Sequence, residues 1–261
     1  LGVALVGVGN ATNMATRYAA ADLAKPERRA STIGLVVAAT TIGSGFGSLV
    51  SLSVFDPLGR RFGLPDYAGS FLVGALLFLA AAAIVEIRLR PDPLVVAGGV
   101  GSNDQDTRLP FSAALGLILA NSKARLAVFA MMVSQATMVA TMTLTPLHMN
   151  DGGQSNGAIS IMLFSHILGM YAFSPLVGRL ADQLGRYPML IASGVLCVAG
   201  ALWAGFTPPE GFIGITGGQT VLGFAWCFGV IAASGLLTDA FPVEQRASVQ
   251  GAGDMRMMAF G

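Results

Sequence analysis

Charged side chains are scarce in this chain, at 11% of its 261 residues, against roughly a quarter in an ordinary soluble domain. Apolar residues reach 54%, so a soluble fold would lack the polar surface that it needs to cover its core. The net charge is only +1, which excludes the basic field that attracts nucleic acid, and we expect no nucleic-acid partner. Two cysteines, Cys197 and Cys227, lie inside apolar stretches, which excludes a disulfide framework.

Patterns typical of enzymes and metal sites are also missing. Residues 6–10 begin like a dinucleotide-binding turn, but no strand follows them. Residues 153–157 match the spacing of a nucleophile elbow, but they lie in a short hairpin between apolar runs without a His–acid partner. No phosphate loop and no metal-spaced Cys/His cluster occurs. We therefore predict no enzyme, no catalytic residues, no cofactor and no metal.

The chain does contain a series of apolar runs, each close to the ~20 residues that a membrane-spanning helix needs. Its 34 glycines suit helices that pack closely in a bilayer. The predicted fold class is all-α integral membrane. We expect the start of an eighth span near Ala247 and seven full spans, at Gly2–Ala21, Ser31–Val54, Tyr67–Ile87, Leu126–Leu147, Ala158–Val177, Met189–Phe206 and Ile213–Leu237.

The cations alternate between the gaps that separate these runs. All but two of the 15 Lys and Arg residues lie in or flank the first, third, fifth and seventh gaps; the exceptions are Arg60 and Arg61. The positive-inside rule places the odd gaps in the cytoplasm. We predict a multi-pass protein of the cytoplasmic membrane, embedded in the lipid bilayer. Because both Leu1 and Gly261 lie in apolar runs, we also expect an internal piece of a longer protein.

The longest gap divides the chain into two bundles. Residues 1–90 and 126–261 hold the spans, and residues 91–125 form a cytoplasmic linker that contains glycine-rich and polar stretches. Within this linker, Phe111–Asn121 is apolar but too short to span. We expect it to be a helix lying on the cytoplasmic surface.

A short internal repeat supports the division. Six residues recur at a constant offset of 217. An even number of predicted spans separates the copies, so both point the same way, as in transporters built from two parallel halves. The first copy is Asp22, Glu27, Arg29, Ala30, Ser31 and Gly34, and the second is Asp239, Glu244, Arg246, Ala247, Ser248 and Gly251.

The fifth gap carries a further motif, made of Gly178, Leu180, Asp182, Gly185 and Arg186. It resembles the signature loop of the major facilitator superfamily, G-x-L-x-D-[RK]-x-G-[RK], with Gln183 in place of the usual cation. Together with the repeat, the resemblance covers the whole chain. It implies helices four to ten and the start of eleven in a twelve-helix fold. Residues 1–90 would then end the N-terminal bundle and residues 126–261 begin the C-terminal one, with a sister signature upstream of Leu1.

The second run contains a glycine spacing that is similar to the fifth-helix motif of proton-coupled efflux antiporters. Gly34, Gly43 and Gly47 carry it, and we predict that they allow close helix packing. The resemblance implies a drug/proton antiporter with protons as the coupling ion. The proline and glycine pair that follow in that family are replaced here by Ser48, Ser51 and Leu52.

The family pattern implies a gating role for the signature loop. Asp182 would accept hydrogen bonds from the N-terminus of the helix that begins near Ser31, in the other half. A helix N-terminus favours a carboxylate by ~0.3–1 kcal/mol. Arg186 would pair with Asp239 and help to close the cytoplasmic side. The alternative is a solvated turn whose surface ion pairs contribute little.

Polar and flexible side chains suggest where a substrate would bind. They lie on one helix face of the first run and on one of the fourth. The face of the first run either lines a cavity or forms hydrogen bonds between helices, and the face of the fourth either lines a cavity or packs in the core. Met-rich surfaces adapt to varied, lipophilic ligands. His166 lies in mid-span, and it is either a proton carrier or substrate contact or a neutral ring bonded to a neighbouring helix. The two faces comprise Asn10, Asn13, Met14 and Arg17, and Met131, Gln135, Met138 and Met142.

These patterns together predict a monomeric secondary transporter. It would move a small, lipophilic solute by alternating access, as proton-coupled efflux. A sugar or metabolite symporter or facilitator is the alternative. A membrane sensor or scaffold that transports nothing is a third hypothesis, from a different class.

Overall fold

The computed structural model describes residues 9, 15–50, 54–65, 68–98 and 109–260. Within these ranges the chain is helical and has no strand, which confirms the all-α prediction. Residues 15–23 form the first described helix. It is followed by η1 (Pro26–Arg28), α2 (Arg29–Val50), α3 (Asp56–Arg61), α4 (Ala68–Arg88), α5 (Pro93–Val96), α6 (Phe111–Ala120), α7 (Ser122–Asp151), α8 (Asn156–Tyr171), α9 (Ser174–Leu184), α10 (Arg186–Phe206), α11 (Phe212–Asp239) and α12 (Val243–Ala259).

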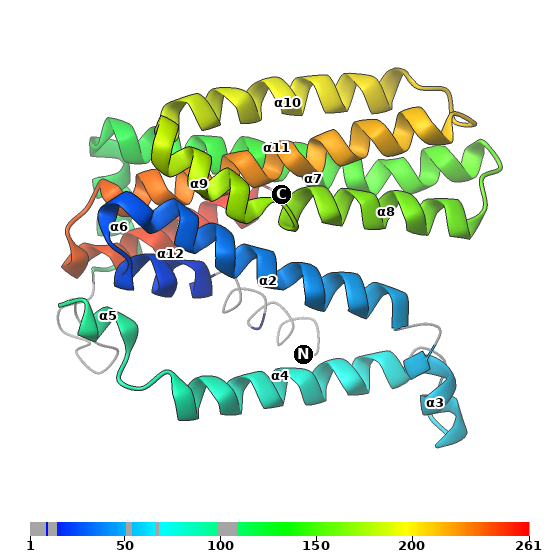
Figure 1. Cartoon of the computed structure of the whole chain (residues 1–261), viewed down its shortest axis with the longest axis horizontal. Coiled ribbons are helices and arrows are strands. Elements are labelled where there is room, and N and C mark those ends of the chain that lie inside the picture. Colours follow the sequence, from blue (N-terminus) through cyan, green and yellow to red (C-terminus); the bar gives the residue numbers. More distant parts are fainter. Residues whose placement is uncertain (1–8, 10–14, 51–53, 66–67, 99–108, 261) are drawn as a thin grey trace.

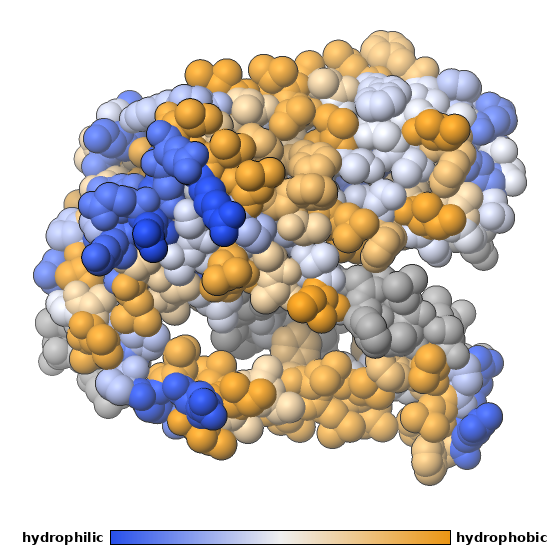
Figure 2. Space-filling view, in the orientation of Figure 1, coloured by the Kyte–Doolittle hydropathy of each residue, from blue (hydrophilic) through white to orange (hydrophobic). Residues whose placement is uncertain are grey.

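Several helices are long and apolar enough to cross a membrane. By length and composition, five candidate spans occur among the described residues. They correspond to the third to seventh predicted runs, and α2 corresponds to the second. Figure 2 shows wide apolar areas on the outer surface, as expected where lipid replaces water. The five are Ala68–Arg88, Ser122–Asp151, Gly157–Leu184, Arg186–Phe206 and Phe212–Asp239.

Helix α11 forms the centre of the larger bundle (Figure 1). It packs against α7, α8 and α10, and it also meets α2, α9 and α12. Every residue from Cys227 to Thr238 is buried except Phe228. Neighbouring helices therefore surround the second half of α11 on all sides, as expected for a span that is apolar all round.

The predicted fifth run, Ala158–Val177, is two helices in the structure. Helix α8 ends at Tyr171, and α9 begins at Ser174 with Pro175 in its first turn. Proline lacks an N–H group and its ring clashes with the preceding turn, so it interrupts a helix. The fifth run is confirmed as one candidate span, Gly157–Leu184, but it is interrupted between α8 and α9 and extends beyond the predicted end at Val177.

The short apolar segment of the linker does form a helix, α6. Its inner face is part of the core, because Ala114 and Ile118 are buried in the cluster that also contains Val128 and Val249. Its outer face exposes Leu119. Helix α6 therefore packs on α7 and α12, and its position on a membrane surface stays a prediction.

Even-numbered gaps between the predicted spans meet at one end of the bundle, and odd-numbered gaps meet at the opposite end. At one end, His148 Nε2 lies 3.0 Å from the Thr207 carbonyl oxygen, and the Gln154 amide donates to the Pro209 carbonyl at 2.6 Å. These contacts join the fourth gap to the sixth. The opposite end, called the charged end below, joins the first, fifth and seventh gaps through Asp22, Arg29, Asp182, Arg186, Asp239 and Arg246.

Candidate functional site at the charged end

Helices α2 and α9 cross with their backbones in direct contact. A Cβ atom added at Gly34 would lie 2.2 Å from the carbonyl oxygen of Ser174, and one added at Gly178 would lie 2.4 Å from that of Ala30. The Ser174 hydroxyl also donates to the Gly34 carbonyl at 2.8 Å. Neither glycine can carry a side chain without separating the helices. Because Asp182 lies one turn after Gly178, this crossing places it at the start of α2.

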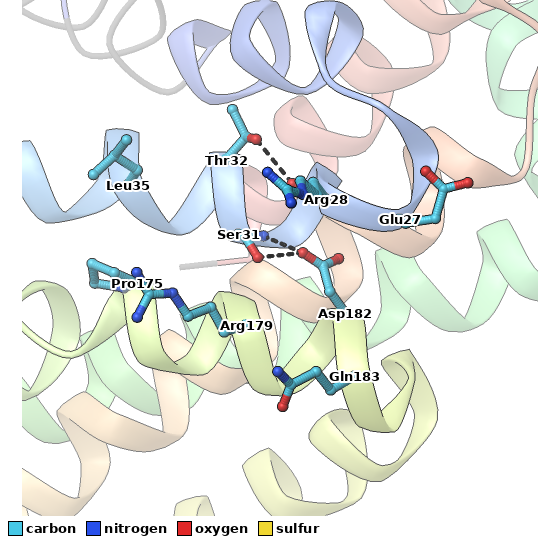
Figure 3. A pocket seen from close by; sticks show the side chains of 9 residues that line it. All are labelled: Glu27, Arg28, Ser31, Thr32, Leu35, Pro175, Arg179, Asp182 and Gln183. Atoms are coloured by element: carbon cyan, nitrogen blue, oxygen red, sulfur yellow. Dashed lines mark hydrogen bonds between the residues drawn. The ribbon is translucent and has the colours of Figure 1, made fainter.

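Asp182 caps the N-terminus of α2 (Figure 3). Its carboxylate accepts the backbone N–H of Ala30 at 3.1 Å and that of Ser31 at 2.7 Å, and it also accepts the Ser31 hydroxyl. The first N–H groups of a helix have no partner within the helix, so an acceptor there satisfies them. These are the contacts that the sequence predicted for this pair of helices, whereas their role in gating stays a prediction.

Arg186 connects this cap to the next helix. Gly185 has a φ of +93°, in the left-handed region that favours glycine, and the chain turns there from α9 into α10. The Arg186 guanidinium donates to Asp182 at 2.6 Å and to Asp239 at 3.4 Å. Gln183, which stands where the family has a cation, is exposed.

Two reciprocal ion pairs join the copies of the repeat. Arg29 pairs with Asp239 at 2.7 Å, and Arg246 pairs with Asp22 at 3.4 Å. The side chain of Asp239 is 33% exposed and that of Asp22 only 5%. Burial raises the pKa of the Asp22 carboxyl, and the neighbouring Arg246 guanidinium opposes that shift. The repeat therefore forms two equivalent bridges that differ in their access to water.

The other residues of the two motifs surround these bridges. Leu180 packs against the buried cluster at the α2–α9 contact. Glu27 and Glu244 are exposed, and neither forms an ion pair with another described residue. A surface groove of about 540 Å³ follows the crossing (Figure 3) and makes the cap reachable from outside. It is lined by Glu27, Arg28, Ser31, Thr32, Leu35, Pro175, Arg179, Asp182 and Gln183.

The predicted cavity face of the first run is only partly described. Asn10, Asn13 and Met14 lie outside the described residues. Arg17 is 2% exposed and pairs with Asp254 at 2.5 Å. The cavity beside Arg17 has a volume of about 20 Å³, close to the space that one water occupies. Of the two alternatives for this face, bonding to neighbouring helices is the one observed at Arg17, through α11 and α12, and a place for it in a substrate cavity stays a prediction.

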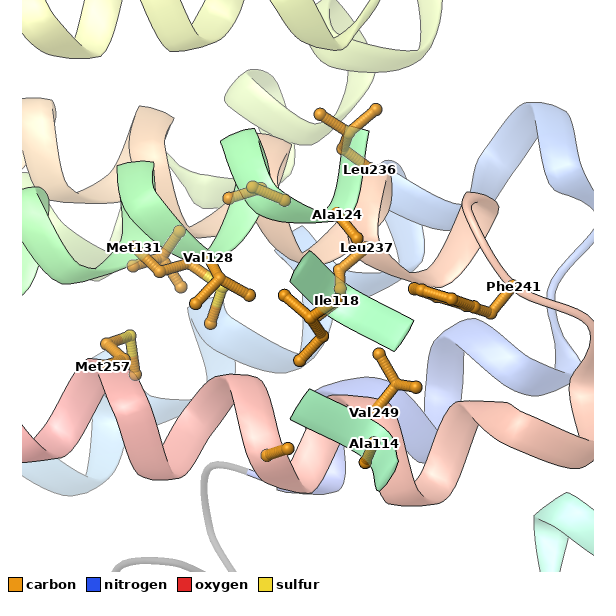
Figure 4. Packing of buried hydrophobic residues seen from close by; sticks show 14 of the residues in the cluster. Ala114, Ile118, Ala124, Val128, Met131, Leu236, Leu237, Phe241, Val249 and Met257 are labelled. Carbon is orange, nitrogen blue, oxygen red and sulfur yellow. The ribbon is translucent and has the colours of Figure 1, made fainter. Parts of the chain in front are cut away.

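The second predicted cavity face is largely core. Met131 is fully buried in the cluster shown in Figure 4, and Met138 packs against the same cluster. Gln135 is 8% exposed and accepts the indole N–H of Trp226 at 2.9 Å. Met142 is half-buried. Of the two alternatives for this face, the structure supports core packing, because α11 fills the space that it faces.

His166 has the environment of a structural histidine. It is fully buried, and its Nδ1 atom lies 2.7 Å from the backbone oxygen of Gln219 on α11. Among the described residues, its Nε2 atom has no hydrogen-bond partner. Of the alternatives left open by the sequence, bonding to a neighbouring helix is the one observed.

The packing glycines of α2 have different surroundings. Gly34 contacts α9 closely, but a Cβ atom at Gly43 would meet no described atom within 4 Å. The prediction of close packing at Gly43 is therefore not met in the described part of the chain. Nine residues turn an α-helix by two and a half turns, so Gly43 lies on the face opposite Gly34. The side chain at position 47 lies outside the described part.

Sequence reasoning missed the partners of Arg17. Asp254 pairs with it, Ser234 accepts its Nε–H at 3.1 Å, and the Tyr18 hydroxyl lies 3.3 Å from its guanidinium. One signal was present, since adding the repeat offset of 217 to position 17 leads to Ser234. No group of three or more His, Cys, Asp or Glu side chains that could hold a metal ion occurs in the described ranges.

The comparisons with known proteins agree with this architecture. The profile of the Major Facilitator Superfamily matches residues 1–258. The chain is 34% identical over 259 residues to the MFS-type transporter YdeG of Bacillus subtilis and 31% identical over 259 residues to YddS of the same organism, covering 98% of this chain in each case. It is 29% identical over 249 residues, or 92% of its length, to the riboflavin transporter RfnT of Brucella anthropi.

The chain spans 60%, 59% and 57% of the lengths of these three relatives. No solved structure matches it significantly. The match over nearly all of the chain agrees with the bundle of long apolar helices, and the family is one of transporters rather than enzymes. The chain therefore belongs to the major facilitator superfamily.

Proposed function

We propose that the protein is a secondary transporter that moves a small solute across a membrane by alternating access. The observation that carries this proposal is the set of bridges at the charged end. They connect residues 15–23 and α2, in the first half, to α9, α11 and α12, in the second. A rocking motion of the halves would break them together, so they suit a latch that closes one side.

The finer proposal is proton-coupled efflux of a lipophilic solute across the cytoplasmic membrane, by a monomer with the charged end toward the cytoplasm. Its support is the glycine spacing of α2 and the distribution of the cations along the sequence.

A second candidate is carriage of a polar metabolite as a symporter or facilitator. A relative that is 29% identical is named a riboflavin transporter. A flavin is therefore the first metabolite to test beside a panel of lipophilic dyes.

Flux measurements in everted vesicles with an imposed pH gradient separate these functions. Solute accumulation in exchange for protons supports efflux. Movement in the same direction as protons supports symport, and movement independent of the proton gradient supports a facilitator. A scaffold or sensor would show no flux for any solute at any gradient, which would contradict the transport proposal.

If these contacts act as a latch, Asp182→Ala should slow transport. The substitution removes the acceptor for three donors of α2, so the closed state loses coupling free energy. We expect transport to fall by about fivefold or more, in line with typical coupling between sites, with unchanged membrane insertion. Gln183→Ala, at the exposed neighbouring position, is the matched control. Full activity of Asp182→Ala would refute the latch.

A further inference from the structure

A buried ion pair lies deeper in the bundle than the latch. The Arg17 guanidinium is 2.5 Å from the Asp254 carboxylate, and their side chains are 3% and 17% exposed. Arg17 is five residues before Asp22 along its helix, which places it about 7 to 8 Å further from the charged end. The pair joins the helix of residues 15–23 to α12, and hence one half to the other.

Two further hydrogen bonds hold the pair. The Tyr18 hydroxyl donates to Asp254 at 3.2 Å, and Arg17 Nε donates to Ser234 at 3.1 Å. Tyr18 and Arg17 are the ionisable groups that contact the carboxylate from the facing helix. Toward the charged end, the next charged groups on the two helices are Asp22 and Arg246, which pair with each other. Helix α11 faces the Arg17–Asp254 pair with the neutral Ser234.

On α12 itself, Arg256 is two residues beyond Asp254 and points about 200° around the helix. The described parts of α2 that adjoin this region, Val36, Val37 and Thr40, carry no charge, and α8 contributes the neutral side chain of Tyr171. Among the described residues, Arg17 is therefore the cation that stabilises the charged form of the Asp254 carboxylate.

Only one of the two equivalent positions given by the repeat carries this charge pair. The offset of 217 relates Arg17 to Ser234 and Asp254 to Val37. Arg17 thus bonds to its own counterpart, and a neutral and an apolar residue occupy the equivalent positions. Because a buried ion pair adds little net stability compared with apolar residues, its presence at one of two equivalent positions suggests a role in the transport cycle.

Separation of the halves would leave the Arg17 and Asp254 charges without their partners, in a water-containing opening flanked by apolar helices, which is costly. Arginine keeps its proton under all physiological conditions, so only the carboxylate can become neutral. We propose that Asp254 takes up a proton when the charged end opens. This rests on the proposed transport function and names the residue that would link it to protons.

The step is a simple protonation. The Asp254 carboxylate takes a proton from the water that reaches it and becomes a neutral carboxylic acid. The charge-assisted bond from Arg17 and the bond from the Tyr18 hydroxyl are lost. Arg17 keeps its positive charge and its bond to Ser234, and closure returns the proton to water as the ion pair forms again.

Opening can be measured without transport, by alkylation of a buried cysteine in the full chain in nanodiscs. Ile33→Cys places the reporter on the buried face of α2, where Ile33 is fully buried. The background carries Cys197→Ala and Cys227→Ala. The rate of reaction with a polar maleimide is divided by that of Gln183→Cys, an exposed site, which removes the effect of pH on thiol reactivity.

We expect the normalised rate to rise as the pH falls. Asp254→Asn, which resembles the protonated acid, should react about tenfold faster than its parent at alkaline pH, a typical coupling magnitude, and should no longer respond to pH. Asp254→Glu should keep the pH response, and it covers the case in which the Asn variant fails to fold. Asp239→Asn is the matched control, because it removes another bridge between the halves and should speed labelling without removing the pH response.

Two results would overturn the proposal. One is an unchanged pH response in a folded Asp254→Asn protein. The other is labelling that ignores pH in the parent protein but responds to an added anionic solute, which would assign Arg17 to substrate binding. Failure here differs from failure of the transport proposal, since flux in the parent protein is measured separately. If the parent protein transports solute but its opening does not depend on Asp254, only the proposed role of Asp254 is refuted.

Discussion

Helices α4 and α11 are both strongly apolar, yet they have opposite surroundings. Their most apolar windows have mean hydropathies of 2.4 and 1.9, and 6% and 78% of these windows are buried. In Figure 2 the surface over α4 is an almost continuous hydrophobic band. In α11 the apolar residues contact other helices instead. Hydropathy therefore identifies both as membrane helices but does not show which one lies inside.

The residues that distinguish the two helices are small or polar. In α11, a Cβ atom at Gly218, Gly223 or Gly229 would lie within 2.5 Å of a neighbouring helix, and buried polar residues such as Gln219 bond across helices. Helix α4 instead presents large exposed side chains such as Phe71. Without a hydrophobic driving force in lipid, close contact and interhelical hydrogen bonds hold helices together, and α11 has both.

The largest expected contrast is between two leucines. Leu222 in α11 is 1% exposed and Leu76 in α4 is 56% exposed. Leu222→Ala should leave a cavity and lower the free energy of unfolding by about 2–5 kcal/mol. Leu76→Ala should change it by less than about 0.5 kcal/mol. Unfolding by a denaturing detergent in mixed micelles measures both. Equal losses would show that α4 is packed as tightly as α11.

A smaller contrast, with opposite signs, is expected for two glycines. A Cβ atom at Gly223 would lie 2.3 Å from the His166 carbonyl oxygen, whereas one at Gly74 in α4 would meet nothing within 4 Å. Gly223→Ala should destabilise by about 1–3 kcal/mol through overpacking. Gly74→Ala should stabilise by up to about 1 kcal/mol through helix propensity. The same unfolding assay applies, and a stabilising Gly223→Ala would contradict the close approach of α8 and α11.

The smallest expected effect concerns a buried hydrogen bond. Trp226→Phe keeps an aromatic ring beside Tyr171, whose centroid lies 5.6 Å away, but leaves Gln135 without its donor. An unsatisfied buried polar group costs about 1–3 kcal/mol, and we expect the low end of that range. Phe71→Leu on the exposed face of α4 is the control. Combining Trp226→Phe with Gln135→Leu should recover part of the loss, and no recovery would show that the bond is not the cause.

The local pattern of apolar residues was enough to predict most of the helices. Apolar runs identified the helices, because a bilayer leaves the backbone few alternatives. The break between α8 and α9 was missed, although Pro175 was visible, because a proline inside an apolar run can either kink a helix or end it. Gly43 was assigned to a packing face from spacing alone, and its place on the opposite side of α2 from Gly34 follows from the helical turn.

The contacts of Asp182 and Arg186 could be predicted because a family motif implied them. The pairs Arg29–Asp239 and Arg246–Asp22 were not predicted, although all four residues belong to the repeat. The surroundings of Arg17 and Gln135 could not be predicted at all. A polar residue on an apolar helix can line a cavity or bond to a neighbour, and sequence spacing is the same in both cases. Trp226 and Asp254 decide between these alternatives, and each lies on a helix far away in the chain.

The amino-acid order by itself determined that this is an all-α bundle of membrane helices, with a short charged motif that recurs at a constant offset. It did so because burial in lipid and helical periodicity act over a few turns of chain. Only the tertiary packing decided that Arg17 meets Asp254, 237 residues away. The pairing of charges over that separation depends on how helices far apart in the chain come together, and no local pattern encodes it.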